Sequence, residues 1–472
     1  LCVTTPESID ELLKSVKSEL GNLSSSLRLP LLFPKISTPN PTMPGRVRQW
    51  PWDEYPQKNI NDEDFRKAKE AIIREHGAEA LRKSWIEVCG RLSLITEDIS
   101  VNGNKLIPIV PADSVLEEGF SPGVEQQIRE TGCVVVRGVI PELTARQLYS
   151  DLKQYVSDNR SQIKGWPEES PSMLQLYNSP TQNAVRSHPN QLRLQRLLNE
   201  LWHDHTERTS SEPLVYLDGV RDRPPQQPFL GLGPHVDAGS LSRWLDPAYR
   251  RSYSAVFGGK SGEWGCWDLS VRQDAVQDLF KAPAHSSVFR AFQGWTALTP
   301  SGPHRGSILL YPNVSAVMAY VLLRPFFCPP ENPVEVMDAS KWSFDKTGCS
   351  FPGTMKDQSQ RLSRTSHPHL RLEECLVHVP EIMPGDTVWW HSDVCHAVDP
   401  EHEGSENASV VYVAACPTTP TTKEYVKQQL ADTLAGFQPK DANGYLKESM
   451  LAGYQGHASL SEEARKAFGY YL

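Results

Sequence analysis

The chain has 472 residues, enough for two or three domains or for one β-rich enzyme with insertions. It carries 48 basic and 57 acidic residues, a net charge of −9. This balance argues against nucleic acid or an anionic membrane surface as the main partner, because both require a basic face. Its nine cysteines are odd in number and include no Cys-x-x-Cys pair, so neither a disulfide framework nor a structural zinc site is expected.

The start of the sequence contains no basic and apolar pattern of a signal peptide. No apolar run reaches the roughly 18 residues that a membrane helix requires. Together with the cysteine pattern, this predicts a reducing, cytoplasmic location. Because residue 1 is leucine rather than methionine, a targeting segment before this sequence stays open.

Residues 1–125 are predicted to form a helical N-terminal extension with an arm. Apolar residues recur at helical spacing between residues 9 and 20, and again from Asp62 to about Arg91 with a break near Gly77. Between these helices, residues 29–60 are rich in proline, threonine and asparagine, a composition that favours an extended arm.

From Gly132 the pattern changes to short apolar runs bounded by glycine, proline, asparagine or aspartate, with one predicted helix from Thr144 to Val156. The predicted strands are 132–140, 215–217, 287–298, 307–311, 387–390 and 409–415. Many short strands separated by turns predict a mainly β core with flanking helices, of the sandwich or jelly-roll type, over residues 126–420.

Two further segments complete the predicted organisation. Residues 324–380 are rich in proline, serine and charge, and are predicted to be an insertion or lid within the core. Residues 421–472 are predicted to be a helical extension that adds to the outer layer or to a dimer interface, and the sequence leaves the oligomeric state open.

Two short segments carry the candidate metal ligands. In Gly233-Pro234-His235-Val236-Asp237 a histidine and a carboxylate lie two residues apart, and on a strand both would point to one face. The segment 384–396 adds His391 and His396 after an apolar strand. Two histidines and one carboxylate are the ligand set that holds non-haem Fe(II) with positions open for oxygen. A His-x-Asp pair alone is also common on protein surfaces, so the hypothesis depends on the second segment.

The run Gly385-Asp386-Thr387-Val388-Trp389-Trp390-His391, followed by His396, resembles the Fe(II)- and 2-oxoglutarate-dependent dioxygenases and, within them, the phytanoyl-CoA hydroxylase-like branch. The resemblance implies that His235, Asp237 and His396 bind iron, whereas His391 packs beside them. Residues 132–140, 293–298 and 306–312 are similar, in the same order, to the opening strand and two core strands of that branch.

Three phrases resemble domain-of-unknown-function family 1479 more closely still: Leu-Gly-Pro-His-Val-Asp-Ala-Gly-Ser-Leu, Phe-Gln-Gly-Trp-Thr-Ala-Leu and Leu-Leu-Arg-Pro-Phe-Phe. The resemblance covers about residues 125–418. It implies a double-stranded β-helix core, the cupin-like jelly roll, with Fe(II), 2-oxoglutarate and O2 as cofactor and cosubstrates. It does not indicate a substrate.

One expected feature of the branch is missing. The branch binds the distal carboxylate of 2-oxoglutarate with a basic residue on the strand after the second histidine, where residues 407–413 contain none. Arg290 and Arg324 are candidate replacements because both lie beside core strand patterns, although either could instead form a structural ion pair. Strand alternation points Arg290 away from Gln293 and Trp295 unless a bulge intervenes.

Other side chains are candidates for the cosubstrate site. Trp295 resembles an aromatic residue that lines this site in the branch, and Gln293 would share its face of the strand. Ser409 and Tyr412 could supply hydroxyl contacts to the carboxylate. Each of these residues could also serve only in packing.

The sequence therefore predicts an Fe(II)/2-oxoglutarate-dependent oxygenase that hydroxylates a small organic molecule and releases succinate and CO2. Halogenating relatives lack the carboxylate ligand, so Asp237 argues against halogenation. Two alternatives remain: a cupin-like metalloenzyme that does not use 2-oxoglutarate, and a non-catalytic jelly-roll binding protein. Metal content distinguishes the binding protein from both enzymes, and succinate release distinguishes the two enzymes from each other.

Overall fold

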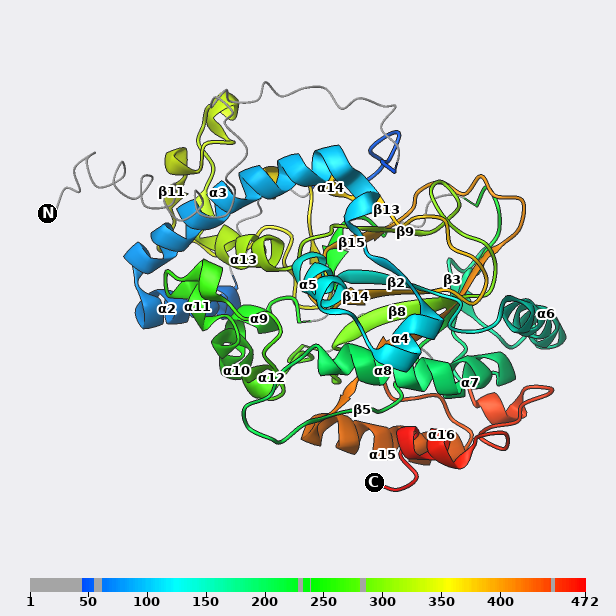
Figure 1. The fold of residues 1–472 in the computed structure, drawn as a ribbon. Coiled ribbons are helices and arrows are strands. Elements are labelled where there is room, and N and C mark those ends of the chain that lie inside the picture. The colour runs from blue at the N-terminus through cyan, green and yellow to red at the C-terminus, as the bar shows by residue number, and fades with distance from the viewer. Residues whose placement is uncertain (1–44, 55–61, 228–231, 238, 281–285, 443–445) are drawn as a thin grey trace, which may run out of the picture. The chain divides into compact units, whose positions relative to one another are not determined.

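Two β-sheets organise the part of the chain that the computed structural model describes, residues 45–54, 62–227, 232–237, 239–280, 286–442 and 446–472. The larger sheet has eight strands in the order β1-β2-β14-β8-β16-β6-β4-β3 (Figure 1). Its strands are β1 (Ile109–Pro111), β2 (Cys133–Arg137), β3 (Gly165–Trp166), β4 (Met173–Leu174), β6 (Val220–Arg223), β8 (Phe292–Ala297), β14 (Thr387–His391) and β16 (Ala408–Ala415).

The smaller sheet has five strands in the order β12-β7-β15-β9-β13, and all of its neighbours are antiparallel. Its strands are β7 (His235–Val236), β9 (Ile308–Leu310), β12 (Gln360–Arg361), β13 (Val377–His378) and β15 (His396–Val398). Two short pairs lie outside both sheets: β5 (Ser210–Pro213) with β17 (Pro417–Thr418), and β10 (Phe327–Cys328) with β11 (Ser343–Phe344).

The centre of the larger sheet follows directly from its sequence. In β2 the β-branched run Val134-Val135-Val136 is fully buried between β1 and β14, as expected for a strand covered on both faces. Gly294 in β8 allows the close approach of β14, because a Cβ there would lie 2.6 Å from the ring of Trp389 and 2.7 Å from the carbonyl oxygen of Val388.

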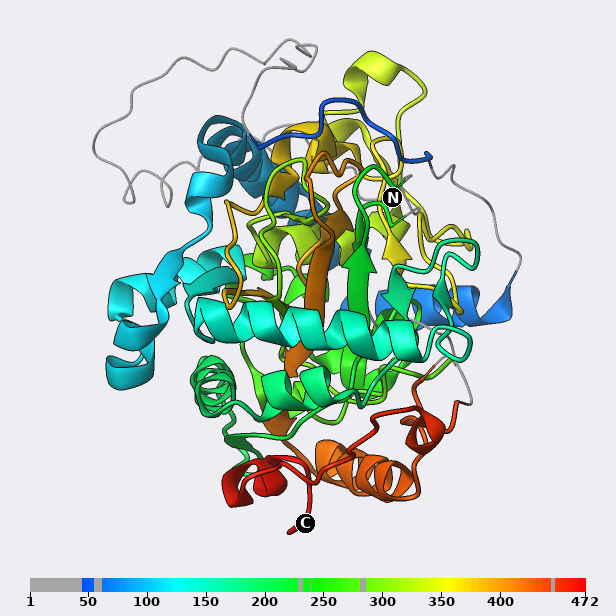
Figure 2. The ribbon, with the colours of Figure 1, turned by 90° about the vertical axis from the view of Figure 1, so that its right-hand side faces the viewer.

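Helices pack against these sheets from several directions. The long α3 (Ala78–Asn102) packs against α13 (Ser315–Leu323), and Gly77, at φ +83°, separates α3 from α2 (Glu63–His76). Helices α7 (Pro180–Ser187) and α8 (Pro189–Glu200) contact β16. Figure 2 shows α6 (Glu142–Asp158) in the foreground, with α15 (Pro420–Leu434) and α16 (Glu462–Ala467) below it. The remaining helices are α4 (Ala112–Glu118), α5 (Pro122–Thr131), α9 (Ser242–Leu245), α10 (Pro247–Arg251), α11 (Ser254–Phe257), α12 (Leu269–Arg272) and α14 (Leu372–Cys375).

Several expectations from the sequence change at this level. The chain has β-sheets and helices as predicted, but more of its residues are helical than extended, so it is less β-rich than the pattern suggested. The predicted break near Gly77 is confirmed. The expected helix at residues 9–20 and most of the arm at 29–60 lie outside the described residues.

The strand predicted at 215–217 is wrong. Val215 and Leu217 are buried, yet the side chain of Gln429 replaces a neighbouring strand by accepting from the Leu217 N–H and donating to the Val215 carbonyl. The apolar alternation therefore predicted the burial of these side chains correctly. The backbone of residues 215–217, however, is hydrogen-bonded by a side chain of the distant helix α15 instead of a neighbouring strand.

The predicted insertion at 324–380 supplies β12 and β13, the two edge strands of the smaller sheet. The described residues all belong to one compact unit, and the predicted domain boundaries remain predictions. No helix within the described ranges is both long and apolar enough to cross a membrane.

Candidate metal centre

The three predicted iron ligands come together at the middle of the smaller sheet. His235 of β7 and His396 of β15 are register partners on adjacent antiparallel strands. Asp237 follows β7 two residues after His235, so strand alternation turns both side chains to the same face. One ligand atom from each residue lies within 4.8 Å of the other two.

The distances within this cluster suit a single divalent ion. Nε2 of His235 lies 3.3 Å from Oδ1 of Asp237, and Nε2 of His396 lies 3.7 Å from Oδ2 of Asp237. Ligands bound at about 2.1 Å in a tetrahedral or octahedral arrangement are separated by ~3.0–3.4 Å, so only a small adjustment would let all three share one ion.

Backbone carbonyls fix the orientation of both imidazoles. Nδ1 of His235 lies 2.7 Å from the carbonyl oxygen of Gly233, and Nδ1 of His396 lies 3.0 Å from that of Val394. A proton on each Nδ1 leaves each Nε2 lone pair available to a metal, the arrangement found around metal-binding histidines.

The Gly-Pro motif before His235 also has a local explanation. A Cβ on Gly233 would lie 2.7 Å from the indole ring of Trp52, so only glycine lets this aromatic side chain cover the strand. The Pro234 carbonyl accepts a hydrogen bond from the Leu362 N–H beside β12. These contacts hold the start of β7 where His235 and Asp237 are needed.

Asp237 is oriented by neutral donors. Nε2 of Gln293 donates to its Oδ2 at 2.7 Å, and Oγ of Ser359 lies 3.4 Å from Oδ1. The Gln293 amide is itself oriented, because its Oε1 accepts from the indole N–H of Trp390 at 2.9 Å. Gln293 was predicted to contact a cosubstrate; in the structure its amide hydrogen-bonds the candidate metal ligand.

Burial and charge set the protonation of the cluster. Burial of Asp237 favours its neutral acid and so raises its pKa. The opposing effects are larger: a hydrogen bond from His235 and the positive charges of His235, His396 and Arg290 hold the pKa of Asp237 well below its usual range. Burial and the nearby His235 lower the pKa of His396 to about 4. A carboxylate and a neutral imidazole at pH 7 are the forms that bind metal.

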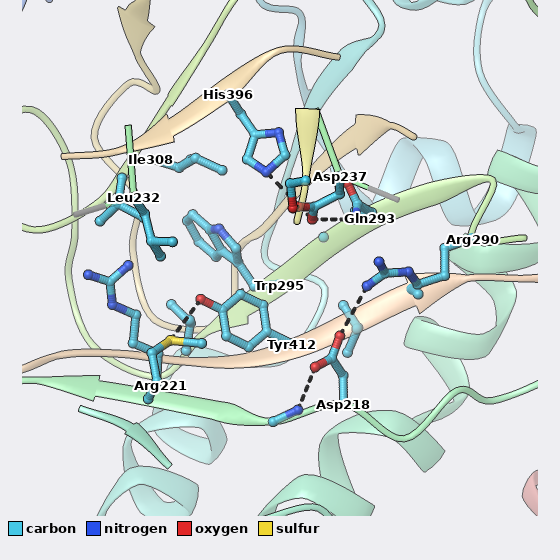
Figure 3. A pocket seen from close by; sticks show the side chains of 18 of the residues that line it. Asp218, Arg221, Leu232, Asp237, Arg290, Gln293, Trp295, Ile308, His396 and Tyr412 are labelled. Atoms are coloured by element: carbon cyan, nitrogen blue, oxygen red, sulfur yellow. Dashed lines mark hydrogen bonds and ion pairs between the residues drawn. The ribbon is translucent and has the colours of Figure 1, made fainter. Parts of the chain in front are cut away.

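A cavity of about 490 Å³ opens beside the cluster and is lined by residues of both sheets. Trp295 of β8 and Tyr412 of β16 form much of one wall, while Ile308 of β9 lies near His396 (Figure 3). The predicted insertion contributes residues 357–359 and 361 to the lining. A volume of this size accommodates a small organic molecule.

Of the two arginines predicted to bind the distal carboxylate of 2-oxoglutarate, Arg290 lies at the cavity and Arg324 does not. Arg290 lines the cavity with Gln293 and Trp295 (Figure 3), and strand alternation does not apply to it because β8 begins only at Phe292. Burial works to lower the pKa of Arg290, but Tyr216, Asp218 and Asp237 raise it, so the guanidinium remains charged. Its Nη1 lies 3.5 Å from Oδ2 of Asp218, a long contact that leaves the guanidinium able to bind another anion.

Arg324 and Ser409 are not among the residues that line this cavity. Arg324 is buried, stacks over Trp342 and donates to the carbonyls of Ser366 and Phe327, which indicates a structural role. Ser409 of β16 is fully buried on the opposite face from Tyr412, as their spacing of three residues requires.

Sequence reasoning missed Arg221. This residue lies on β6, is 5% exposed and lines the cavity, and its Nε and Nη2 have no hydrogen-bond partner among the described residues. The signal was present in Arg221 and Arg223, two arginines at strand spacing. The strand β6 was not predicted, because two alternating arginines are unusual on a buried strand.

His391 packs away from the cluster. Its ring stacks on Trp202, its Nε2 lies 3.0 Å from the Cys266 carbonyl, and its Nδ1 accepts the Asp393 N–H at 3.0 Å. With both nitrogens occupied, His391 has no free lone pair for a metal.

Comparisons with known proteins agree with this architecture. The family model described as Gig2-like matches residues 58–470. A protein of Escherichia coli K12, the uncharacterised YbiU, is 28% identical over 380 residues, 77% of this chain and 85% of that protein.

Two solved structures are similar over most of their length. The first is GlcNAc Inducible Gene 2 from Candida albicans, which carries the designation of domain-of-unknown-function family 1479. It has a TM-score of 0.78 and 23% identity, and the match covers 88% of this chain and 90% of that one. The second is a Salmonella typhimurium LT2 protein proposed to be an oxidoreductase, with a TM-score of 0.74, 26% identity, and coverage of 88% and 99%.

Proposed function

The chain belongs to the Gig2-like family, and from this membership and the site geometry we propose that it is a non-haem Fe(II)- and 2-oxoglutarate-dependent oxygenase. The two sheets, with the cavity between their strands, are proposed to be the double-stranded β-helix of that superfamily. The observation that carries the proposal is the triplet His235, Asp237 and His396, with both Nε2 atoms directed toward the carboxylate, beside a cavity that is also lined by arginines.

In this proposal His235, Asp237 and His396 hold Fe(II) on one side and leave its remaining positions facing the cavity. When bound, the iron with 2-oxoglutarate and O2 supplies oxidation of a substrate C–H bond, coupled to formation of succinate and CO2. The chain orients these groups: Gln293 holds the Asp237 carboxylate, and the apolar walls formed by Trp295 and Ile308 exclude water.

We assign Arg290 as the residue that binds the distal carboxylate of 2-oxoglutarate. It is close enough to Asp237 and His396 for its charge to influence both, and its planar guanidinium can pair with a carboxylate through two hydrogen bonds. Arg221 lies on the other side of Tyr412 in Figure 3 and is assigned to an acidic group of the substrate. The substrate is therefore proposed to be a small organic anion.

The test is anaerobic titration of the purified protein with Fe(II) and then 2-oxoglutarate, followed by assay of succinate formed under O2. A weak visible charge-transfer band that requires both additions, and disappears in His396→Ala, is expected. Bound iron without the band or succinate would favour the cupin-like metalloenzyme, and a protein that binds no iron would favour the non-catalytic binding protein.

The anchor assignment is tested separately with matched arginine variants. Arg290→Met should raise the 2-oxoglutarate concentration for half-saturation about 100-fold, the value of two charge-assisted hydrogen bonds. Arg221→Met, which removes another arginine of the cavity lining, should leave that concentration unchanged. The opposite result would exchange the two assignments without affecting the iron site.

A further inference from the structure

A second cluster of metal-ligand side chains lies on the other face of the smaller sheet. His378 on β13 pairs in register with Leu309 of β9, which pairs in turn with Ala397 of β15. Asp399 follows β15 three residues after His396, and an odd spacing on a strand reverses the face. Whereas His396 and Val398 line the cavity, His378 and Asp399 are absent from its lining.

The central pair of this cluster is completely buried. Nε2 of His378 lies 3.2 Å from Oδ2 of Asp399, and both side chains have an exposed fraction of 0%. Neither ring nitrogen of His378, nor Oδ2 of Asp399, has a hydrogen-bond partner of good geometry among the described residues. Such buried polar atoms are costly unless something else binds them.

His304 completes the cluster from the loop before β9. Its ring centroid lies 4.7 Å from that of His378, and one ligand atom each from His304, His378 and Asp399 lies within 4.8 Å of the other two. Nδ1 of His304 lies 2.7 Å from Oε2 of Glu401, and a small rotation of the ring would turn this contact into a hydrogen bond that leaves Nε2 to an ion. A carboxylate behind a histidine is a common way of orienting a metal ligand.

Access to this cluster is from outside the sheet. The side chains of His304 and Glu401 are 18% and 26% exposed, in contrast to the fully buried pair behind them. Glu401 also lies 3.2 Å from Nη1 of Arg48, a guanidinium that it shares with Glu403. An ion could therefore enter past His304 and reach His378 and Asp399.

We propose that His304, His378 and Asp399 form a second divalent-metal site of the zinc type, with Glu401 as the positioning residue behind His304. Two imidazoles and one carboxylate suit Zn²⁺ and exclude a preference for Ca²⁺ or Mg²⁺, which favour oxygen ligands. The spacing of 3.2 Å between His378 and Asp399 matches the 3.3 Å between His235 and Asp237 across the sheet. The ion would join the loop before β9, strand β13 and the end of β15, and so would brace the strand that carries His396.

The experiment uses the full chain with its cavity cluster disabled. In Asp237→Ala/His396→Ala, stripped with a chelator and equilibrated with Zn²⁺, mass spectrometry of the metal should find one zinc per chain. Adding His304→Ala should raise the zinc Kd more than about 100-fold, and adding Glu401→Gln instead should raise it about 10-fold. Adding His203→Ala, an exposed histidine 3.8 Å from Asp268, should leave it unchanged.

Two results would overturn the proposal: no zinc in Asp237→Ala/His396→Ala, or undiminished zinc after His304→Ala is added. Circular dichroism checks that the variants are folded, and His304 is exposed enough that its replacement should not unfold the chain. As a measurement that needs no variant, anomalous diffraction at the zinc edge from zinc-loaded crystals should place a peak among the three side chains. Crystals with a peak only at His235, Asp237 and His396 would equally contradict it.

Discussion

Two carboxylates, the fully buried Asp393 and the partly exposed Asp237, are surrounded very differently. Asp393 receives hydrogen bonds from two arginines: Arg243 at 2.5 Å, and Arg272 at 2.8 and 2.9 Å. All three side chains are at most 3% exposed. Asp237 instead accepts a hydrogen bond from the neutral amide of Gln293 at 2.7 Å, and two imidazoles lie beside it.

This difference separates a structural carboxylate from one suited to bind a cation. The charge of Asp393 is already more than balanced, whereas no arginine or lysine of the described residues lies within ion-pair distance of the Asp237 carboxylate. Arg243 joins the two regions, since its Nη1 donates to Asp393 while its Nη2 donates to the Asp237 backbone carbonyl at 2.8 Å. The arginine cluster thus supports the backbone of the candidate metal site and leaves its carboxylate free.

The largest effect should come from breaking the arginine cluster. Asp393→Asn leaves two guanidinium groups buried without a counter-charge, so the free energy of unfolding should fall by about 3–5 kcal/mol. Guanidinium denaturation followed by circular dichroism measures this loss. Asp237→Asn should cost clearly less in metal-free protein, because a neutral amide and two imidazoles surround this carboxylate in place of two guanidinium groups. Equal destabilisation by both changes would contradict the distinction drawn between the two carboxylates.

Removing Asp237 should act on metal affinity rather than stability. Asp237→Ala should weaken Fe(II) or Co(II) binding at the cavity site by at least about 100-fold, or ~2.7 kcal/mol, because one of three protein ligands is lost. Anaerobic competition with a chromogenic chelator measures the affinity. Asp218→Asn, which removes another cavity carboxylate, is the control and should bind metal normally. If both variants bind alike, Asp237 is not a ligand.

Features of the fold that depend on neighbouring residues could be predicted from the sequence, whereas contacts between distant segments could not. The β-branched run of β2 and the break at Gly77 depend on neighbouring residues and were predictable. The approach of His235 and Asp237 follows from strand alternation, but their meeting with His396 was implied only by family resemblance. Nothing in the spacing of residues 235 and 396 indicates that β7 and β15 pair.

The cavity arginines show why the rest could not be predicted. Alternation misjudged Arg290 because it treats residue 290 as part of a strand that begins at Phe292. Arg221 was overlooked because a buried guanidinium whose Nε and Nη2 lack partners is unfavourable in an ordinary core, and it becomes reasonable only beside a cavity. Both errors concern residues that line the cavity, where the requirements of a binding site override the local patterns of strand alternation and burial.

A smaller effect is expected from His391, which packs beside Asp393. Burial lowers its pKa from 6.5 to about 4, with Arg272 adding to the shift and Asp393 opposing it. Between pH 6.5 and pH 4 this histidine is protonated in the unfolded chain but neutral in the folded chain. The free energy of unfolding therefore falls as the pH drops through this window. Between pH 7 and pH 5 this residue should account for about 2 kcal/mol of the loss.

Denaturation at both pH values in wild type and His391→Phe measures that contribution. The variant loses two hydrogen bonds and should be less stable at pH 7, but its stability should depend less on pH by the amount given above. His203→Phe, at an exposed histidine, controls for the loss of one imidazole. An unchanged pH dependence in His391→Phe would mean that this histidine does not titrate differently on folding.

The smallest effect tests how the Asp237 carboxylate is held. Gln293→Leu removes the donor at 2.7 Å from Oδ2 and leaves the Trp390 indole N–H without its acceptor, while all three ligands remain. Because partners behind a metal ligand typically contribute 10- to 100-fold in affinity, Gln293→Leu should weaken metal binding about 10-fold, or ~1.4 kcal/mol. Gln273→Leu, at a buried amide that donates to Thr206 instead, is the matched control and should not alter the affinity. A loss as large as that of Asp237→Ala would make Gln293 indispensable to the site, whereas no loss would show that the Gln293 amide is not needed to orient Asp237.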